Sequence, residues 1–306
     1  MLSSSPPGAE RSVRRARPLL GTRVDIRVAG LDAPAAHAAV DAAFAAIADV
    51  HRLMSFHETG SDLSALHREA SRTAVTVHRH TASVLRLALA LSRESDGRFD
   101  ISIGHRLVQS GLLPAPAGAA TPDPAADWHD IELLDGDRVR FRRPLWIDLG
   151  GIAKGYAVDC AIEVLRDAGA TQACVNAGGD LRVIGPQPES VAIRLDAGDA
   201  SGTAPHIELE NAALASSCGH TLRRSCAGTP AGPHLRGAHG AHIDTDLTAV
   251  VVAPRAMVAD ALTKIVLADA DAAGPVLRAH GAQAWRHHPR EGWHALAQTT
   301  AATPLN

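Results

Sequence analysis

A chain of 306 residues, 46% of them apolar, can bury the core of one large domain or of two closely joined lobes. Its formal net charge is −3 and its acidic and basic residues are interspersed, which argues against a basic face that binds nucleic acid. No segment approaches about 18 uninterrupted apolar residues, so we expect no membrane span.

The N-terminal residues 1–17 are polar and carry serines, prolines and a cluster of arginines. A twin-arginine export signal requires an apolar segment after the arginines, but Pro18-Leu19-Leu20 runs directly into Gly21. We therefore predict a short disordered leader over residues 1–17 and a single domain over 18–306. The four cysteines lack metal-type spacing and fit a reduced, cytoplasmic setting, although Cys218 and Cys226 could pair.

The first third of the chain predicts one strand and three helices. Residues 22–28 alternate between apolar and polar side chains, which is typical of a half-buried strand. A helix is expected over 32–54, where Asp and Pro provide start signals, and a short one over 61–70. A third helix is expected to begin with Thr81 as its cap and to end near Gly97.

The rest of the chain alternates irregularly between strands and helices, which favours an α+β fold. Residues 112–126 are rich in Pro, Ala and Gly and predict a surface loop, and residues 219–244 are rich in Gly and His and weakly patterned. We expect two strands near 131–134 and 139–141, joined by an Asp135-Gly136 turn. Further strands are expected near 173–176, 191–195, 207–209 and 247–252. Helices are expected over 153–168 and 258–268.

The densest chemical signal is the segment Ile147-Asp-Leu-Gly-Gly-Ile-Ala-Lys-Gly-Tyr-Ala-Val-Asp159. It predicts a strand ending at Asp148, a glycine turn and a helix behind it. Such a turn offers free backbone N–H groups and the positive end of a helix dipole, which suit a phosphate, although a glycine pair before a helix is also an ordinary tight turn.

The second signal is Asp260 with Thr263 and Lys264 on an otherwise apolar helix. Asp260 and Lys264 lie one turn apart on one face, as in an ordinary i,i+4 ion pair, but their neighbours are too apolar for a solvated face. Of the 30 basic residues only Lys154 and Lys264 are lysines, and both fall inside these two motifs. Codon bias is the plain alternative explanation of that coincidence.

Six segments in order resemble the FAD:protein FMN transferases, the ApbE family. They span residues 18 to about 270 and are Leu20-Gly21-Thr22, Met54-Ser55-Phe56 with Ser61-Asp-Leu-Ser-Ala-Leu, Gly97-Arg-Phe-Asp-Ile, Asp148 to Asp159, Asn176-Ala-Gly-Gly-Asp and Ala259-Asp-Ala-Leu-Thr-Lys. The resemblance implies a two-lobed, T-fold-like α+β domain with the ligand cleft between the lobes. It also implies transfer of FMN from FAD to a threonine of an acceptor flavoprotein, with Mg²⁺ and release of AMP.

Carried over by position, the resemblance also implies the site residues. Those that bind FAD are Leu20, Phe56, Phe99, Asp100, Ile101, Asp148, Lys154 and His234. The metal would be held by the carbonyl of Gly151, by Asp260 and by the residue at position 264, for which Thr263 is the candidate substitute. Asp260, Lys264 and Lys154 would carry the catalysis, because a cleaved pyrophosphate needs charge neutralisation on its oxygens.

The chain departs from the family pattern in three places. Lys264 stands where the family has a threonine that ligates the metal, and an ammonium cannot ligate a cation. Either Thr263 substitutes, or one ligand is lost, or the charge of Lys264 replaces part of the metal's role. The segment around His234 lacks the family's Asp-Pro, and Phe56 replaces a common tyrosine, which keeps the ring but loses a hydroxyl.

Two other functions stay open from the sequence. One is an FAD pyrophosphatase that uses water and yields FMN and AMP, and the other is a flavin-binding protein without turnover. The histidines His220, His239 and His242 could also form a metal cluster. The acceptor protein and the oligomeric state cannot be derived from these patterns.

Overall fold

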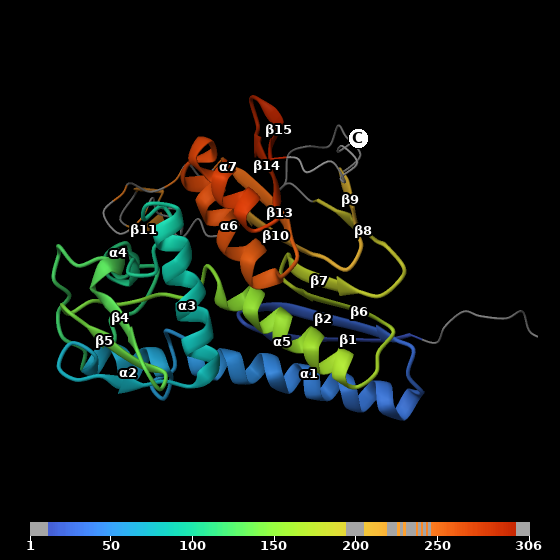
Figure 1. Cartoon of the computed structure of the whole chain (residues 1–306), viewed down its shortest axis with the longest axis horizontal. Coiled ribbons are helices and arrows are strands. Elements are labelled where there is room, and N and C mark those ends of the chain that lie inside the picture. The colour runs from blue at the N-terminus through green and yellow to red at the C-terminus, as the bar shows by residue number, and fades with distance from the viewer. Residues whose placement is uncertain are drawn as a thin grey trace, which may run out of the picture.

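The larger lobe is built on an antiparallel sheet. The computed structural model describes residues 12–193, 205–218, 225–226, 229–230, 237, 240, 243 and 246–297 (Figure 1). The strands in spatial order are β1 (Val13–Leu19), β2 (Thr22–Ala29), β6 (Gln172–Ala177), β7 (Asp180–Ile184), β10 (Ala213–Cys218), β13 (Thr248–Ala253), β14 (Gln283–His288) and β15 (Gly292–Ala297). Every neighbouring pair is antiparallel.

Three long helices pack on one face of this sheet, as Figure 1 shows: α1 (Ala33–Met54), α5 (Ala153–Asp167) and α6 (Ala256–Ala268). Helix α1 begins where predicted, because the Asp32 carboxylate accepts the N–H of Ala35 at 2.8 Å. Among the described residues it is the one helix that is long and apolar enough to cross a membrane by length and composition. Its stripe of Val40, Phe44 and Ile47 is buried against the rest of the fold, as in a core helix.

The opposite face of the sheet is covered in part by the hairpin of β8 (Glu189–Ala192) and β9 (His206–Leu209). Leu209 belongs to a second apolar cluster with Val183, Leu214 and Val250 of the sheet. Helix α7 (Ala270–Ala279) follows α6 and contacts β14 and β15.

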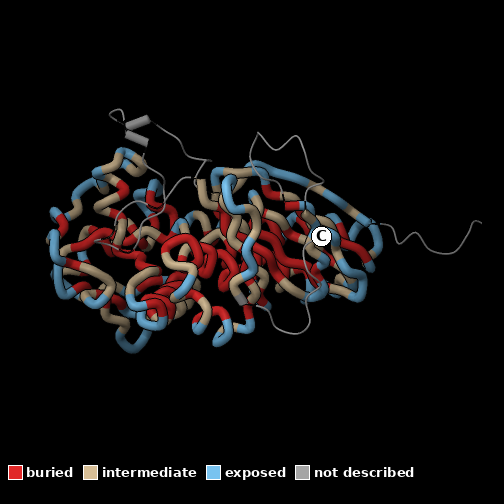
Figure 2. Tube along the Cα trace, turned by 90° about the horizontal axis from the view of Figure 1, so that it is seen from above, coloured by how far each residue is buried: buried red, intermediate tan, exposed pale blue. Residues whose placement is uncertain are grey.

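The smaller lobe holds the remaining helices and a short sheet. Its elements are α2 (Asp62–Glu69), α3 (Arg79–Glu94), α4 (Gly104–Gln109), the short helix η1 (Trp128–Asp130), and the sheet β3-β5-β4 formed by β3 (Val75–Thr76), β5 (Arg138–Phe141) and β4 (Ile131–Leu134). A separate pair, β11 (Ser225–Cys226) and β12 (Thr229–Pro230), is also described. The main core includes residues of both lobes, and Figure 2 shows buried chain running through both.

The N-terminal prediction is wrong for residues 13–17. Strand β1 covers this segment and pairs with β2 along its whole length, from Val13 opposite Val28 to Leu19 opposite Thr22. The segment looked unstructured because it is an edge strand with charged side chains, such as Arg14, which binds Asp25 at 2.8 Å. Residues 1–11 lie outside the described part of the chain.

The start of the third helix also differs from the prediction. Helix α3 begins at Arg79, and the ring nitrogen Nδ1 of His78 accepts the N–H of His80 at 3.2 Å as its cap. Thr81 does not cap the helix, because its hydroxyl donates to Asp62 Oδ2 at 2.5 Å. The contact of Thr81 therefore joins α3 to α2.

Candidate functional site

The glycine turn after Ile147 lies against the smaller lobe, but most of its backbone is already bonded. The N–H of Asp148 donates to the carbonyl of Ile101 at 2.7 Å. The N–H of Gly150 donates to Asp148 Oδ2 at 3.1 Å, and those of Ile152 and Ala153 donate to Leu149 O at 3.0 and 2.8 Å. The prediction of free amides for a phosphate is therefore wrong for these four groups.

The two predicted motifs meet where α5 crosses α6. A Cβ placed on Gly155 would lie 2.2 Å from the carbonyl oxygen of Ala256, so only glycine permits this approach. The N–H of Gly155 donates to Asp260 Oδ2 at 3.0 Å. Asp159, one turn further along α5, accepts the N–H groups of Ala256 and Met257 at 3.0 Å each and so caps α6.

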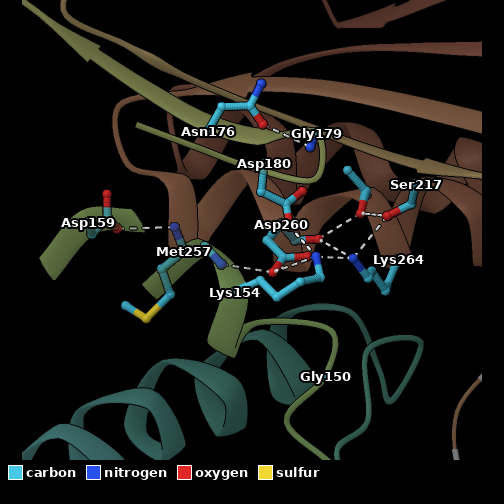
Figure 3. Close-up of polar contacts among 12 residues, drawn as sticks. Gly150, Lys154, Asp159, Asn176, Gly179, Asp180, Ser217, Met257, Asp260 and Lys264 are labelled. Carbon is cyan, nitrogen blue, oxygen red and sulfur yellow. Dashed lines mark hydrogen bonds and ion pairs between the residues drawn. The ribbon is translucent and has the colours of Figure 1, made fainter. Parts of the chain in front are cut away.

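Four charged side chains converge at this crossing, as Figure 3 shows. Lys154 binds Asp180, and its Nζ also lies 3.8 Å from Asp260 Oδ2. Lys264 Nζ lies 2.5 Å from Asp260 Oδ1, 3.1 Å from Asp260 O and 2.9 Å from Ser217 Oγ. We call these four charged residues, Lys154, Asp180, Asp260 and Lys264, the charge cluster.

Only the positive members of the charge cluster reach the surface. The side chains of Lys154 and Lys264 are 34% and 14% exposed, whereas those of Asp180 and Asp260 are 1% and 0% exposed. A ligand that approaches the cluster therefore meets the two lysine side chains, because the carboxylates have almost no exposed surface. This arrangement suits an anion.

The pKa shifts in the charge cluster follow from burial and pairing. Burial alone would lower the pKa of Lys154, but Asp180 and Asp260 raise it further than burial lowers it, so Lys154 stays protonated. Burial opposes the charge of Asp260, but the two ammonium groups outweigh it and hold its pKa below the ordinary value. Burial and the neighbouring Asp260 raise the pKa of Asp180, whose Oδ1 has no hydrogen-bond partner among the described residues.

The predicted metal ligands do not fit Mg²⁺ in this arrangement. One carboxylate oxygen of Asp260 accepts a hydrogen bond from Lys264, and the other accepts one from the N–H of Gly155. Thr263 is fully buried, and its hydroxyl donates to Asp260 O at 2.6 Å and lies 2.7 Å from Ser217 Oγ. No group of three or more His, Cys, Asp or Glu is arranged for a metal within the described ranges.

The predicted aromatic and loop residues lie along the same region. Phe99, Asp100 and Ile101 are buried, and Ile101 accepts the amide of Asp148 described above. The ring of Phe56 packs 5.1 Å from that of His67, whose Nε2 lies 3.0 Å from the carbonyl oxygen of Ile147. Phe56 and Ile101 therefore lie near the segment before the glycine turn. The prediction of a strand ending at Asp148 is wrong, because the backbone of this segment bonds to His67 and Ile101 rather than to a neighbouring strand.

Leu20 occupies the tight turn between β1 and β2. Leu20 and Gly21 have φ angles of +54° and +70°, as a two-residue hairpin turn requires. They line an open cavity of about 710 Å³ together with Arg17, Arg23 and His51, but Lys154 and Asp260 do not line it. Thr22, which follows this turn, packs against Gly178 in the β6–β7 turn before Asp180.

Several predictions concern residues outside the described part of the chain. His234 lies there, as do His220, His239 and His242 and the side chain of Cys226. The role of His234, the histidine cluster and the Cys218–Cys226 pair stay predictions.

Two polar residues of the cluster region were missed from the sequence. Asp180 belongs to the segment Asn176-Ala-Gly-Gly-Asp180 and could have been chosen from that motif. Ser217 carried no signal, because its strand β10 is largely buried and was not predicted.

Comparisons with known proteins agree with the fold and with the motifs. A sequence model of the ApbE family matches residues 20–284. The FAD:protein FMN transferase of Treponema pallidum is 29% identical over 194 residues, which cover 57% of this chain and 52% of that protein. The FAD:protein FMN transferase of Haemophilus influenzae is 27% identical over 239 residues, which cover 72% of this chain and 69% of that protein. The chain thus spans about half of the first relative and about two thirds of the second.

Solved structures share the architecture. The ApbE protein of Thermotoga maritima superimposes with a TM-score of 0.81 at 23% identity and covers 93% of this chain and 97% of its own. The flavinyl transferase ApbE of Pseudomonas stutzeri, in its apo form, superimposes with a TM-score of 0.77 at 19% identity. The superposition covers 95% of this chain and 96% of that protein. The α+β fold, the ordered motifs and the match over residues 20–284 lead to one conclusion: this chain belongs to the ApbE family.

Proposed function

We propose that this protein transfers FMN from FAD to a threonine hydroxyl of an acceptor flavoprotein and releases AMP. The observation that carries the proposal is the charge cluster, in which two lysine side chains are partly exposed and two carboxylates are buried. The FAD:protein FMN transferases that match this chain support the choice of FAD as the anion.

The reaction forms one phosphorus–oxygen bond and breaks another. The threonine oxygen attacks the phosphorus on the flavin side of the pyrophosphate, and the bond from that phosphorus to the bridging oxygen breaks. AMP leaves with the bridging oxygen, and the hydroxyl proton is released. Negative charge that develops on the phosphate oxygens is stabilised by fixed positive groups, which is the main requirement in phosphoryl transfer.

In this proposal Lys154 and Lys264 supply the positive charge. Because the amides of Gly150, Ile152 and Ala153 are bonded within the protein, the charge of the lysines rather than these amides attracts the pyrophosphate.

Incubation with FAD and a peptide that carries an acceptor threonine tests the proposal. Covalent FMN on the peptide, detected by mass spectrometry together with stoichiometric AMP, is the expected result. AMP without the adduct would assign a pyrophosphatase instead, and intact bound FAD would assign a flavin carrier. A peptide with alanine in place of the acceptor threonine is the matched control and should stay unmodified.

A further inference from the structure

We infer that the ammonium of Lys264 takes the place of a divalent cation in this protein, so that FAD is bound and cleaved without added metal. The inference rests on the proposed function for its reaction, but its structural part concerns only the residues around Lys264. The bonds formed and broken in the reaction are those given above.

The ammonium of Lys264 is surrounded by oxygen atoms. Its three neighbours are Asp260 Oδ1 at 2.5 Å, Asp260 O at 3.1 Å and Ser217 Oγ at 2.9 Å. An ammonium has three N–H donors, and three oxygens within hydrogen-bond distance satisfy them. Carboxylate, carbonyl and hydroxyl oxygens are also what a hard cation such as Mg²⁺ requires. The ammonium of Lys264 therefore donates to the oxygen atoms that a metal would need as ligands.

The stem of Lys264 fills the space beside the glycine turn. A Cβ on Gly151 would lie 3.3 Å from Lys264 Cε and 3.5 Å from Cγ, so the side chain packs directly on this residue. Gly151 is the residue whose carbonyl was expected to bind the metal. The lysine thus lies between the expected ligands Gly151 and Asp260.

The charges of the cluster balance without a metal. Two ammonium groups, Lys154 and Lys264, oppose two carboxylates, Asp180 and Asp260, and the carboxylates are almost fully buried. A dication added to this neutral group would leave an uncompensated double charge next to buried surface, which is costly.

Lys264 and Lys154 have different tasks in this arrangement. All three donors of Lys264 are engaged by protein oxygens, so it acts on the pyrophosphate as a fixed charge. Lys154 is more exposed, at 34% against 14%, and can bind a phosphate oxygen directly.

The test measures two properties of the purified full chain: the rate of FAD cleavage with and without metal, and the binding of a metal ion. In excess EDTA, wild-type AMP release should stay within about twofold of its rate in Mg²⁺, whereas a metal-dependent site would lose at least about a hundredfold. Mn²⁺, followed by electron paramagnetic resonance, should show no saturable binding to the wild type, with or without FAD. Both wild-type measurements need no substitution, so they stand even if a variant fails to fold.

The Lys264→Thr variant should reverse both results. Without the ammonium, the charge cluster carries one net negative charge and the oxygens around it are free for a cation. The variant should bind Mn²⁺ saturably and should cleave FAD only with added metal. Arg166→Thr makes the same charge change at an exposed site on α5 and should match the wild type in both measurements.

The outcomes separate this inference from the proposed function. Saturable Mn²⁺ binding by the wild type, or loss of cleavage in EDTA, would overturn the role of Lys264 and leave the flavin transfer intact. No cleavage under any condition would overturn the transfer reaction, while the Mn²⁺ measurement alone would still decide whether Lys264 excludes a metal.

Discussion

At the scale of single residues, the site depends on which polar atoms are buried and which are paired. Asp260 has no exposed surface and still carries a charge, because Lys264, Lys154 and the amide of Gly155 surround its two oxygens. Removal of one partner from such a group leaves a buried charge without compensation, which costs more than the pair itself contributes. Stability and ligand binding are therefore linked at this site and have to be measured separately.

The first prediction separates these two roles for Lys154. The change Lys154→Met should lower the free energy of unfolding by at least about 2 kcal/mol, because Asp180 loses its ion-pair partner. The double change Lys154→Met with Asp180→Asn should restore much of that stability but not FAD binding. Urea unfolding and calorimetric titration with FAD would check this, and recovery of binding in the double variant would show that Lys154 only balances Asp180.

The second prediction concerns acid stability through His67. Burial is the main reason that the pKa of this ring falls from 6.5 to about 4. Because the folded pKa lies below the unfolded one, the unfolded chain binds the proton more tightly. The stability that the neutral ring provides is complete above pH 6.5 and is lost as the pH falls towards 4, by up to about 3 kcal/mol.

The measurement is urea unfolding across this pH range in the wild type and in His67→Gln. Glutamine keeps a polar group near Ile147 but does not titrate, so its stability should change less steeply with pH. Equal slopes in the two proteins would exclude His67 as a source of the acid sensitivity.

At the scale of elements, the crossing of α5 and α6 positions the chemistry. Gly155 allows the close approach, and Asp159 caps the start of α6 from the side of α5. Asp159 also accepts from Arg182 on β7 at 3.0 Å, which joins both helices to the sheet. The segment from Lys154 to Asp159 is therefore mainly a packing motif, and Lys154 is the member to which the proposed function assigns the ligand.

The third prediction tests this crossing with a Gly155→Ala change. The added methyl would meet Ala256 O at 2.2 Å, so the helices must move apart and stability should fall by about 2–4 kcal/mol. FAD affinity should fall as well, because Lys154 and Asp260 lie on either side of the contact.

Gly60→Ala is the matched control, because nothing lies within 4 Å of the added Cβ and Gly60 has no left-handed φ angle. This change should leave the free energy of unfolding within about 0.5 kcal/mol of the wild type. Chemical unfolding of both variants measures the change in the free energy of unfolding. Similar changes in the two variants would contradict a close crossing at Gly155.

At the scale of the whole molecule, the site is assembled from segments that are far apart in the chain. Hydrogen bonds join Ile101 to Asp148 and Gly155 to Asp260, and Lys154 reaches Asp180 on β7. The two lobes share one main core, so these contacts are held by the fold as a unit (Figure 2).

The fourth prediction is that FAD protects these segments together. In hydrogen exchange followed by mass spectrometry, added FAD should slow exchange over residues 99–102, 147–156, 176–181 and 256–264. Ligand binding to the folded state should also raise the melting temperature with FAD concentration. Protection of the β1–β2 turn alone, around the 710 Å³ cavity, would place FAD elsewhere.

The sequence by itself determined the family, the α+β class and most helices, because these depend on local chemistry. Neighbouring residues determine the helix caps such as Asp32 and Ser61, the helical apolar stripe of α1 and the glycine turn. Strand β7 was missed because it is buried on both faces and lacks the alternation that marks a half-buried strand. Helix α7 was missed because Pro275 interrupts its pattern.

Only the tertiary structure decided what the candidate site can bind. Whether an amide is free, whether an oxygen of Asp260 is available and which charge faces outward depend on partners that lie far away in sequence, 105 residues apart for Gly155 and Asp260. The sequence raised three explanations for Lys264, and the packing of its ammonium among the oxygens of Asp260 and Ser217 favours one of them. The physical reason is that burial and pairing set the energy of a charge, and neither exists until the chain is folded.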